Sequence, residues 1–425
     1  MMRFFFAGLT TLFLLLSVVQ KGCTLSESIT SQNLAHIYKT KTMMMHPEFV
    51  VYHFSDDSSR IYIRIKKEEL QAVVSQPANK IFTVKLFYKL YKESKDNIVA
   101  DSGTTVFSDS IPSDEFPWIH GHADFKAENL SAYFLDLKIT DTNKNFSSRF
   151  LVNVDKTSNQ SAQNFLLSDS WTTEPIFYSY ISDSTSISMT HRMPFSGKLL
   201  GKYFHRNFPL ALPPFSLETP AKFNYKEDSL FLVNCSEINS SGFFSRSGFY
   251  HLQIDSSDKK GLTVFRFHPG FPDIYSSEQL IEPLRYLTSK SEFGELSSSS
   301  DKRQAADKFW INIGGNPERA KELIRRFYHR VKDANRFFTS FTEGWKTDRG
   351  MIFIIFGSPN IVNKNYNQEV WIYGEVGDLG SVTFSFYKVV NPFTDNDYNL
   401  NRSQIYDLAW YKTVEMWRQG RINND

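Results

Sequence analysis

The sequence predicts a multidomain, β-rich protein: two immunoglobulin-like β-sandwiches followed by a small α+β domain with helices packed on an antiparallel sheet. Two observations favour the sandwiches. Short stretches of alternating apolar and polar residues recur from residue 34 to about residue 270, and Asp, Ser and Asn turns separate them. A third observation sets the last part of the chain apart, because apolar residues there recur at the spacing of an amphipathic helix.

Composition is that of a globular protein, with 425 residues, of which 41% are hydrophobic and 22% charged. The formal net charge is only +2, so we expect no nucleic-acid partner. Aromatic residues reach 16%, which suits β-rich domains and sizeable interfaces, although Phe-rich cores explain the same excess.

Residues 1–22 have the pattern of an export signal peptide. A short basic start precedes the almost wholly apolar run Phe4–Val19, and the small residue Gly22 follows before Cys23. This pattern predicts lipoprotein processing, in which Cys23 becomes the lipidated first residue and residues 23–33 form a tether. Several acyl chains on one residue would anchor the protein stably to a membrane. Gln20 occupies a position that is usually aliphatic in such signals, so simple cleavage and a retained anchor stay open as alternatives.

The first β region is expected at residues 34–155 and the second at residues 164–270. Alternation predicts five strands in the first region, namely Phe49–Phe54, Arg60–Ile65, Ile81–Tyr88, Ser131–Ile139 and Ser148–Val154. It predicts four in the second, namely Pro175–Ile181, Ser229–Val233, Phe249–Ile254 and Leu262–Phe267. Three prolines in Pro209–Phe215 predict an extended connector rather than a strand.

Residues 275–425 are predicted to form a helical linker and an α+β domain. Helices are expected at Ser277–Ser289 and Asp301–Trp310, and a longer one should begin with Asn316 as N-cap and Pro317 in the first turn. Strands at Glu369–Tyr373 and Ser381–Tyr387 and a helix at Asp407–Arg418 complete the prediction.

The stretch Gly344–Gly350, running directly into Met351–Phe356, is the most distinctive in the chain. The apolar run is short and mostly β-branched or aromatic, which predicts a buried strand between two turns. Gly344 and Gly350 are expected to supply the positive φ angles of a sharp turn.

These residues resemble the signature of the GWxTD-domain family of envelope lipoproteins from the Bacteroidota lineage. The resemblance covers Asp307–Ile422, with matching segments in the family's order: Arg326–Val331, Ala334–Phe338, Gly344–Gly350, Ile355–Pro359, Glu369–Tyr373, Trp410–Tyr411 and Trp417–Arg418. It implies a protein facing the periplasm or the outer membrane, and no catalytic residues. Residues 24–28 lack the acidic cluster expected of surface-exported lipoproteins in that lineage, which favours the periplasmic face over the cell surface.

The signature loop is interpreted as structural or partner-binding through Gly344, Trp345, Thr347, Asp348, Arg349 and Gly350. Trp345 would fill the core, Asp348 would cap backbone amides, and Arg349 would pair with Glu343 or Glu369. The alternative is a ligand or catalytic site on the loop Lys346–Arg349, where exposed polar side chains often carry function.

No metal or other cofactor is predicted. His120, His122 and Asp124 share one side of an extended segment, but two histidines without a further ligand make a weak metal site. Asp395–Asn399 resembles the start of a calcium loop without its glycine or final acid, and Asn/Asp turns explain it. In that lineage Ser110, Ser184 and Ser229 fit a short O-glycosylation pattern.

These features together predict a non-enzymatic, lipid-anchored lipoprotein of the outer membrane. It would act as an accessory or scaffold subunit of an envelope complex for secretion, transport or assembly that includes a β-barrel partner. One alternative is a periplasmic or surface binding module for glycan or peptide. The other is an enzyme centred on Lys346–Arg349.

Overall fold

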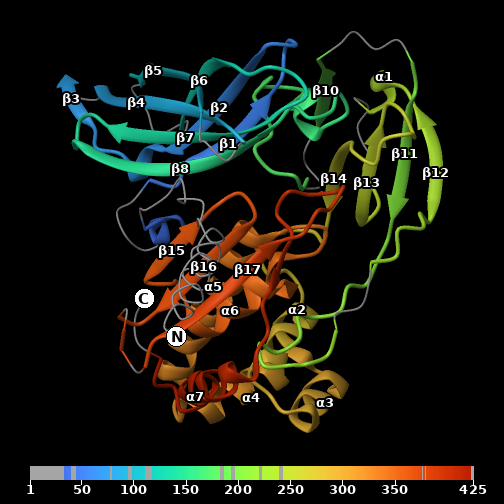
Figure 1. The fold of residues 1–425 in the computed structure, drawn as a ribbon. Helices are drawn as coiled ribbons and strands as arrows, with labels where there is room; N and C mark the ends of the chain where they lie inside the picture. The colour runs from blue at the N-terminus through green and yellow to red at the C-terminus, as the bar shows by residue number, and fades with distance from the viewer. Residues whose placement is uncertain are drawn as a thin grey trace, which may run out of the picture.

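The computed structural model describes residues 33–39, 45–76, 79–93, 98–110, 117–181, 186–192, 197–219, 223–238, 243–375, 377–378 and 380–422. The predicted signal peptide and Cys23 therefore lie outside the described residues. Two β regions and a C-terminal α+β region are visible, with the first β region stacked on the C-terminal region and the second beside both (Figure 1). Within these ranges no helix is both long and apolar enough to cross a membrane.

The first β region consists of two antiparallel sheets that enclose one hydrophobic core. One sheet has the order β1 (Glu48–Tyr52), β2 (Ser58–Lys66) and β6 (Trp118–Lys126). The other has the order β3 (Val73–Gln76), β4 (Asn79–Lys92), β7 (Ala132–Asp141) and β8 (Phe146–Asp155), with β5 (Val99–Asp109) also paired to β4. The five predicted strands are all present, because strict alternation turns one face of each strand into the shared core.

The second β region has a smaller, similar arrangement. A pair of strands, β9 (Phe165–Asp169) and β10 (Ile187–His191), shares a core with a four-stranded antiparallel sheet. The order of that sheet is β12 (Ser229–Val233), β11 (Leu199–Phe204), β13 (Gly248–Gln253) and β14 (Leu262–Arg266), and the short helix α1 (Cys235–Ile238) follows β12. The strand predicted at Pro175–Ile181 is wrong: only isolated bridges form there, from Pro175 to Ser168 and from Tyr180 to Phe265.

The C-terminal region packs helices on a four-stranded antiparallel sheet. Its helices are α2 (Ser277–Ile281), α3 (Lys290–Ser298), α4 (Lys302–Gly314), α5 (Pro317–Phe338), α6 (Asp348–Phe356) and α7 (Asp407–Arg418), with 3-10 turns at Glu282–Tyr286, Gly344–Lys346 and Gln404–Tyr406. The sheet order is β15 (Ile361–Lys364), β16 (Gln368–Tyr373), β17 (Val382–Lys388) and β18 (Tyr398–Leu400). Asn316 caps α5 as predicted, accepting a hydrogen bond from the amide of Arg319 at 2.9 Å.

The strand predicted at Met351–Phe356 is wrong, because this run forms the helix α6. Thr347 is its N-cap and accepts a hydrogen bond from the amide of Gly350, and Asp348 lies in the first turn. Residues 348–355 are all buried, so the helix is enclosed by protein on every side. A short apolar run without a polar face has no period that separates a buried helix from a buried strand.

The N-terminal end of the described chain belongs to the C-terminal core rather than to the first β region. The 3-10 turn η1 (Ala35–Tyr38) lies beside β15 (Figure 1), and Leu34 donates its amide to the carbonyl of Val362 at 2.9 Å. Leu34, Ala35 and Tyr38 are buried among the residues of the C-terminal core. The predicted start of the first sandwich at residue 34 is therefore corrected to a point after η1.

The second β region is joined to the C-terminal region by the long connection between β11 and β12. This segment contains the predicted connector Pro209–Phe215, in which Ala211 donates to the carbonyl of Lys346 at 3.0 Å. Phe215 contacts the ring of Tyr411 on α7, with centroids 5.1 Å apart. A separate aromatic cluster, formed around Phe204, Phe249, Phe265 and Phe393, fills the contact between the two regions.

Candidate functional site

The signature loop lies where α5, the 3-10 turn η5 (Gly344–Lys346) and α6 meet. Trp345 is only 4% exposed and forms part of the C-terminal core. Its amide donates to Asn335 Oδ1 at 3.2 Å, and its carbonyl accepts from the hydroxyl of Tyr286 at 3.0 Å. Trp345 thus holds the loop against α5, as the sequence predicted when it placed this side chain in the core.

Gly344 and Gly350 are needed for close approach of backbones rather than for positive φ. Neither belongs to the described glycines with positive φ, so that expectation is wrong. A Cβ on Gly344 would lie 2.0 Å from the carbonyl oxygen of Ala334, and one on Gly350 would lie 1.9 Å from that of Gly344. The two glycines therefore let α5, η5 and α6 touch along their backbones.

Arg349 is fully enclosed and forms an ion pair with Glu369 on β16. The distance from Arg349 Nη1 to Glu369 Oε2 is 3.0 Å, with side chains 2% and 0% exposed. The guanidinium also donates to the carbonyl of Asn396 at 3.0 Å and stacks 4.0 Å from the ring centroid of Tyr398. The predicted pairing of Arg349 with Glu343 or Glu369 is thus confirmed for Glu369.

Glu369 is the centre of a buried polar cluster. Its Oε1 accepts hydrogen bonds from the hydroxyl of Tyr38 at 2.5 Å and from Trp371 Nε1 at 2.8 Å. Burial alone would raise the pKa of Glu369, but Lys364, Arg349 and these hydrogen bonds hold it below its ordinary value. Burial, strengthened by the charge of Glu369, raises the pKa of Tyr38 well above its ordinary value. Both charges of the ion pair are therefore matched inside the core.

Asp348 also bonds within the fold. Its Oδ2 accepts the amide of Leu400 at 2.7 Å, and Arg402 forms an ion pair with Oδ1. Burial raises the pKa of Asp348 despite Arg402 and the Leu400 amide. The carboxylate ties the start of α6 to β18, in keeping with the capping of amides predicted for Asp348.

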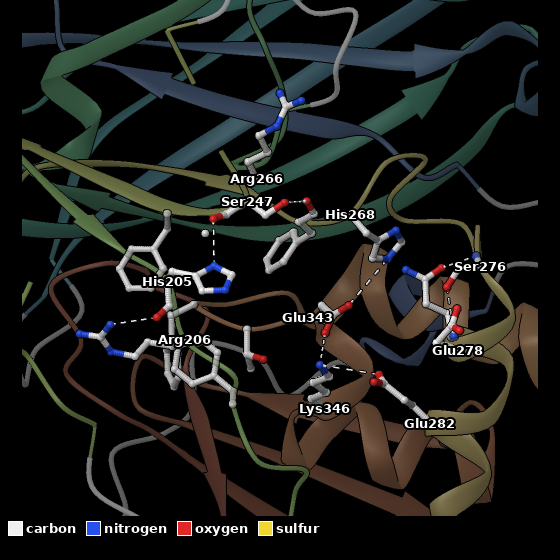
Figure 2. Close-up of a pocket in the computed structure, with 17 residues that line it drawn as sticks. His205, Arg206, Ser247, Arg266, His268, Ser276, Glu278, Glu282, Glu343 and Lys346 are labelled. Atoms are coloured by element: carbon white, nitrogen blue, oxygen red, sulfur yellow. Dashed lines mark hydrogen bonds and ion pairs between the residues drawn. The ribbon is translucent and has the colours of Figure 1, made fainter. Parts of the chain in front are cut away.

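Lys346 is the residue of this loop that reaches a cavity. Figure 2 shows its ammonium beside Glu343 and Glu282, at Nζ to oxygen distances of 2.5 and 3.9 Å, and His268 directed at Glu343 from 3.7 Å. Burial raises the pKa of Glu282 although Lys346 acts in the opposite direction. Asp348 and Arg349 do not line this cavity, so the loop Lys346–Arg349 does not act as one unit there.

The cavity has a volume of about 340 Å³ and lies between the second β region and the C-terminal region. No pattern in the sequence predicts this cavity, since its walls come from the segment after β11, from β13, β14 and α2, and from the signature loop. It is lined by the rings of Phe208, Phe249, Phe267 and Phe341 and by the polar side chains of His205, Arg206, Ser247, Arg266, His268, Ser276, Glu278, Gln279, Glu282, Thr342, Glu343 and Lys346. The hydroxyl of Ser276 caps α2, and that of Ser247 donates to the carbonyl of Phe267 at 3.1 Å. These two serines therefore serve local structure rather than forming a nucleophile–base pair.

The remaining candidate residues are placed apart from this region. On β6, Asp124 pairs with Arg60 at 2.6 Å, and His120 lies 3.1 Å from Glu174. Asp395 pairs with Lys388, and Asp397 accepts from Asn391 at 2.9 Å. In the described part of the chain, no group of three or more His, Cys, Asp and Glu residues could hold a metal ion.

The three predicted glycosylation sites differ in their settings. Ser110 is exposed, whereas Ser184 lies outside the described residues. Ser229 is the first residue of β12, and its Oγ is shielded from solvent. The setting of Ser229 therefore does not match the exposed loop expected of a glycan acceptor.

Comparison with solved structures finds remote likenesses, among them three structures of β-glucuronidase from Bacteroides uniformis. A calcium-binding mutant of β-glucuronidase 2 has 6% identity and a TM-score of 0.18, covering 34% of this chain and 14% of that one. β-Glucuronidase 2 covalently bound to cyclophellitol-6-carboxylate aziridine has 10% identity and a TM-score of 0.16, covering 25% and 12%. A further β-glucuronidase has 9% identity and a TM-score of 0.16, covering 27% and 15%. This chain thus spans a small part of each relative, and TM-scores this low carry no argument about fold or activity.

A search of curated proteins finds no match. A family model does match the chain, from the start of β13 to the residue after α7, and it spans most of the cavity walls as well as the signature loop. The match begins earlier than the predicted segment Asp307–Ile422 and includes β13 and β14 of the second β region. Residues 248–419 match the family model of the GWxTD domain.

Proposed function

We propose that this protein is a non-enzymatic lipoprotein anchored in the outer membrane through Cys23, facing the periplasm. It would act as an accessory or scaffold subunit of an envelope complex for secretion, transport or assembly. Its partner would include a β-barrel protein. The two β regions, which we propose are immunoglobulin-like, would serve as spacers and docking surfaces beside the C-terminal region.

The observation that carries this proposal is the burial of the signature. Asp348, Arg349 and Glu369 are 7%, 2% and 0% exposed, and the hydrogen bonds and ion pairs described above join them to one another or to the surrounding backbone and side chains. Groups held in this way organise a core, whereas a catalytic group must meet a substrate. The most distinctive sequence feature is therefore better explained by a stable scaffold than by a reaction.

The surface adds to this argument. Leu230 and Leu232, which alternate with Phe231 along β12, are 56% and 62% exposed. Apolar side chains gathered on the surface are typical of sites where another protein docks.

The position of η1 supports attachment of the GWxTD domain close to a membrane. About ten residues separate Cys23 from Asn33, and an extended chain of that length spans at most about 35 Å. Asn33 itself is bonded to β15, because its Oδ1 accepts the amide of Val362 at 3.0 Å. Lipidation of Cys23 would thus hold η1, and the C-terminal region on which it packs, within about 35 Å of the bilayer.

Purification of the full-length protein from its native membrane in gentle detergent tests this proposal, together with metabolic labelling by a fatty acid. We expect label on the wild type and none on the Cys23→Ala variant. Mass spectrometry should identify a stoichiometric β-barrel partner. Recovery of the protein alone, under conditions that keep known complexes intact, would refute the subunit role. Absence of label would refute the anchor.

A second candidate function is a binding module for glycan or peptide, favoured by the cavity of about 340 Å³. Its aromatic rings and charged side chains are typical of sites that bind polar ligands with an apolar face. Titration with oligosaccharides of the envelope, followed by calorimetry, would reveal this activity. The Phe341→Ala variant should abolish any heat of binding that arises in the cavity.

A further inference from the structure

The strand β12 forms one edge of the four-stranded sheet in the second β region and pairs only with β11 among the described strands. Figure 1 shows it at the outer side of the molecule, away from the first β region. Alternate backbone N–H and C=O groups of an edge strand point away from its neighbour. Such an edge is a template on which another strand can pair.

Two other sheet edges, at β14 and β15, are covered by the protein's own chain. At β14, the amide of Ile181 donates to the carbonyl of Phe265 and the amide of Phe265 donates to the carbonyl of Ser179, both at 2.9 Å. At β15, the amide of Leu34 donates to the carbonyl of Val362. No such backbone bond to β12 from outside β11 is found within the described ranges.

The composition of β12 does nothing to prevent pairing. Its sequence, Ser-Leu-Phe-Leu-Val, contains no charge and no proline, the features that usually protect an exposed edge. Leu230 is 56% exposed and Leu232 is 62% exposed. An apolar edge strand of this kind is expected to be covered in the working protein.

The two faces of β12 have different surroundings. Val233 is buried in the core of the second β region, and the ring of Phe231 covers Gly201, where a Cβ would lie 2.1 Å from it. Leu230 and Leu232 pair with Lys202 and Leu200 of β11 and lie on the opposite face. That face also carries Phe204, which packs with Phe249 and Phe393. The exposed leucines therefore continue the face on which the C-terminal region already docks.

We propose that the edge of β12 receives an extended apolar segment of a partner protein as a fifth strand, whose side chains pack on Leu230 and Leu232. This inference rests on the proposed role as a complex subunit and specifies where that partner binds. Backbone hydrogen bonds supply affinity in such strand addition, and alternate side chains supply specificity. The partner segment must be rich in aliphatic residues, because β12 presents Leu230 and Leu232 on one face and Phe231 on the face of the core.

A second copy of this chain is a poorer occupant. A strand of five residues is about 17 Å long, and two such strands paired with each other bury far less than the roughly 800 Å² per partner of a stable dimer. A partner that other contacts already hold beside this protein is present at a high effective concentration. The binding free energy of one added strand is then sufficient to keep its segment on β12.

The test uses the full-length protein in its native membrane, with the photo-crosslinking amino acid p-benzoylphenylalanine at position 230 or 232. Positions 217 and 408 are matched controls, because their leucines are 75% and 76% exposed elsewhere on the surface. We expect crosslinks from 230 and 232 to one aliphatic segment of the co-purified partner, and weaker crosslinks from the controls. Amide hydrogen exchange of residues 229–233 should slow about tenfold or more in the complex relative to the free protein.

A double variant, Leu230→Lys with Leu232→Lys, adds a functional readout. It should reduce the co-purified partner about tenfold while leaving the melting temperature unchanged, since both side chains are exposed. Leu217→Lys should retain the partner. Crosslinks confined to 217 or 408, crosslinks to a second copy, or unchanged exchange at 229–233 would overturn the inference while the subunit role stands. If the wild type brings down no partner, the subunit role itself fails and this inference fails with it.

Discussion

Tyr38 and Glu369, which are 331 residues apart in the chain, share a buried hydrogen bond of 2.5 Å. The tyrosine comes from the segment that follows the predicted tether, and the glutamate comes from β16 in the GWxTD domain. Glu369 also holds Arg349 of the signature. The start of the described chain is therefore part of the core that the signature organises.

We expect the Tyr38→Phe variant to lower the free energy of unfolding by about 1–2 kcal/mol, because the buried carboxylate loses one of its donors. Trp371 still donates to the same oxygen, which limits the loss. Urea denaturation of the two proteins measures the difference. Tyr366→Phe is the control, since Tyr366 is 45% exposed, and it should change stability by less than about 0.5 kcal/mol.

Replacing Arg349 by methionine should destabilise the protein by about 3–5 kcal/mol, because Glu369 is left as a buried charge without its arginine. The double variant Arg349→Met with Glu369→Gln should lose less than the sum of the single changes, and a double-mutant cycle in denaturant measures this coupling. The exposed pair of Arg60 and Asp124 provides the comparison, for which we expect at most about 1 kcal/mol. Additive single changes at Arg349 and Glu369 would contradict the buried pair.

Alanine at Gly344 or at Gly350 should prevent stable folding of the GWxTD domain. In both cases the new Cβ would meet a backbone oxygen at 2.0 Å or less, which a flexible side chain cannot relieve. Gly294 in α3 is a matched control, because nothing lies within 4 Å of the position that a methyl group would take there. Gly294→Ala should be neutral or stabilise by up to about 1 kcal/mol. Circular dichroism during thermal unfolding compares the three variants, and a Gly344→Ala protein that melts like the wild type would disprove the close contact.

Two buried histidines should make the β regions lose stability in acid. His53 bonds to Ser59 and to the carbonyl of Asp155, and His251 bonds to Thr263 and to the carbonyl of Lys259. Burial lowers the pKa of His53 to about 4 and that of His251 to about 4. An unfolded histidine binds a proton below about pH 6.5, whereas these bind one only near pH 4 in the folded state. Stability is therefore fully present above about pH 6.5 and falls as the pH drops towards 4, by at most about 3 kcal/mol for each histidine.

Urea denaturation at several pH values between about 7 and 4 measures this dependence. His53→Gln should be less stable at about pH 7 but should show a shallower slope below about pH 6.5, because one of the two groups no longer titrates. A slope in the His53→Gln variant equal to that of the wild type would exclude the assignment to His53.

Local patterns in the sequence predicted several of the strands and helices, although not β3, β5, β9, β10, β11, β15 or β18. Strict alternation identified strands such as β2 and β7, since the period of two survives wherever one face is buried. The N-cap at Asn316 and the apolar stripe that follows it identified α5. The pairing of Arg349 with a carboxylate, either Glu343 or Glu369, was predicted too, and the structure selects Glu369.

Tertiary structure alone decided the rest. Met351–Phe356 forms a helix that protein encloses on every side. Because no face of it is polar, its sequence lacks the period that would distinguish a helix from a strand. Gly344 and Gly350 are required by backbones that approach from α5 and η5, and no local signal reports such neighbours. The docking of η1 on β15, the cavity beside Lys346 and the open edge of β12 all join segments far apart in the chain. The periodicity of a few consecutive residues predicts which face of a segment is buried. It does not predict which distant segment covers that face, because this depends on the packing of the whole chain.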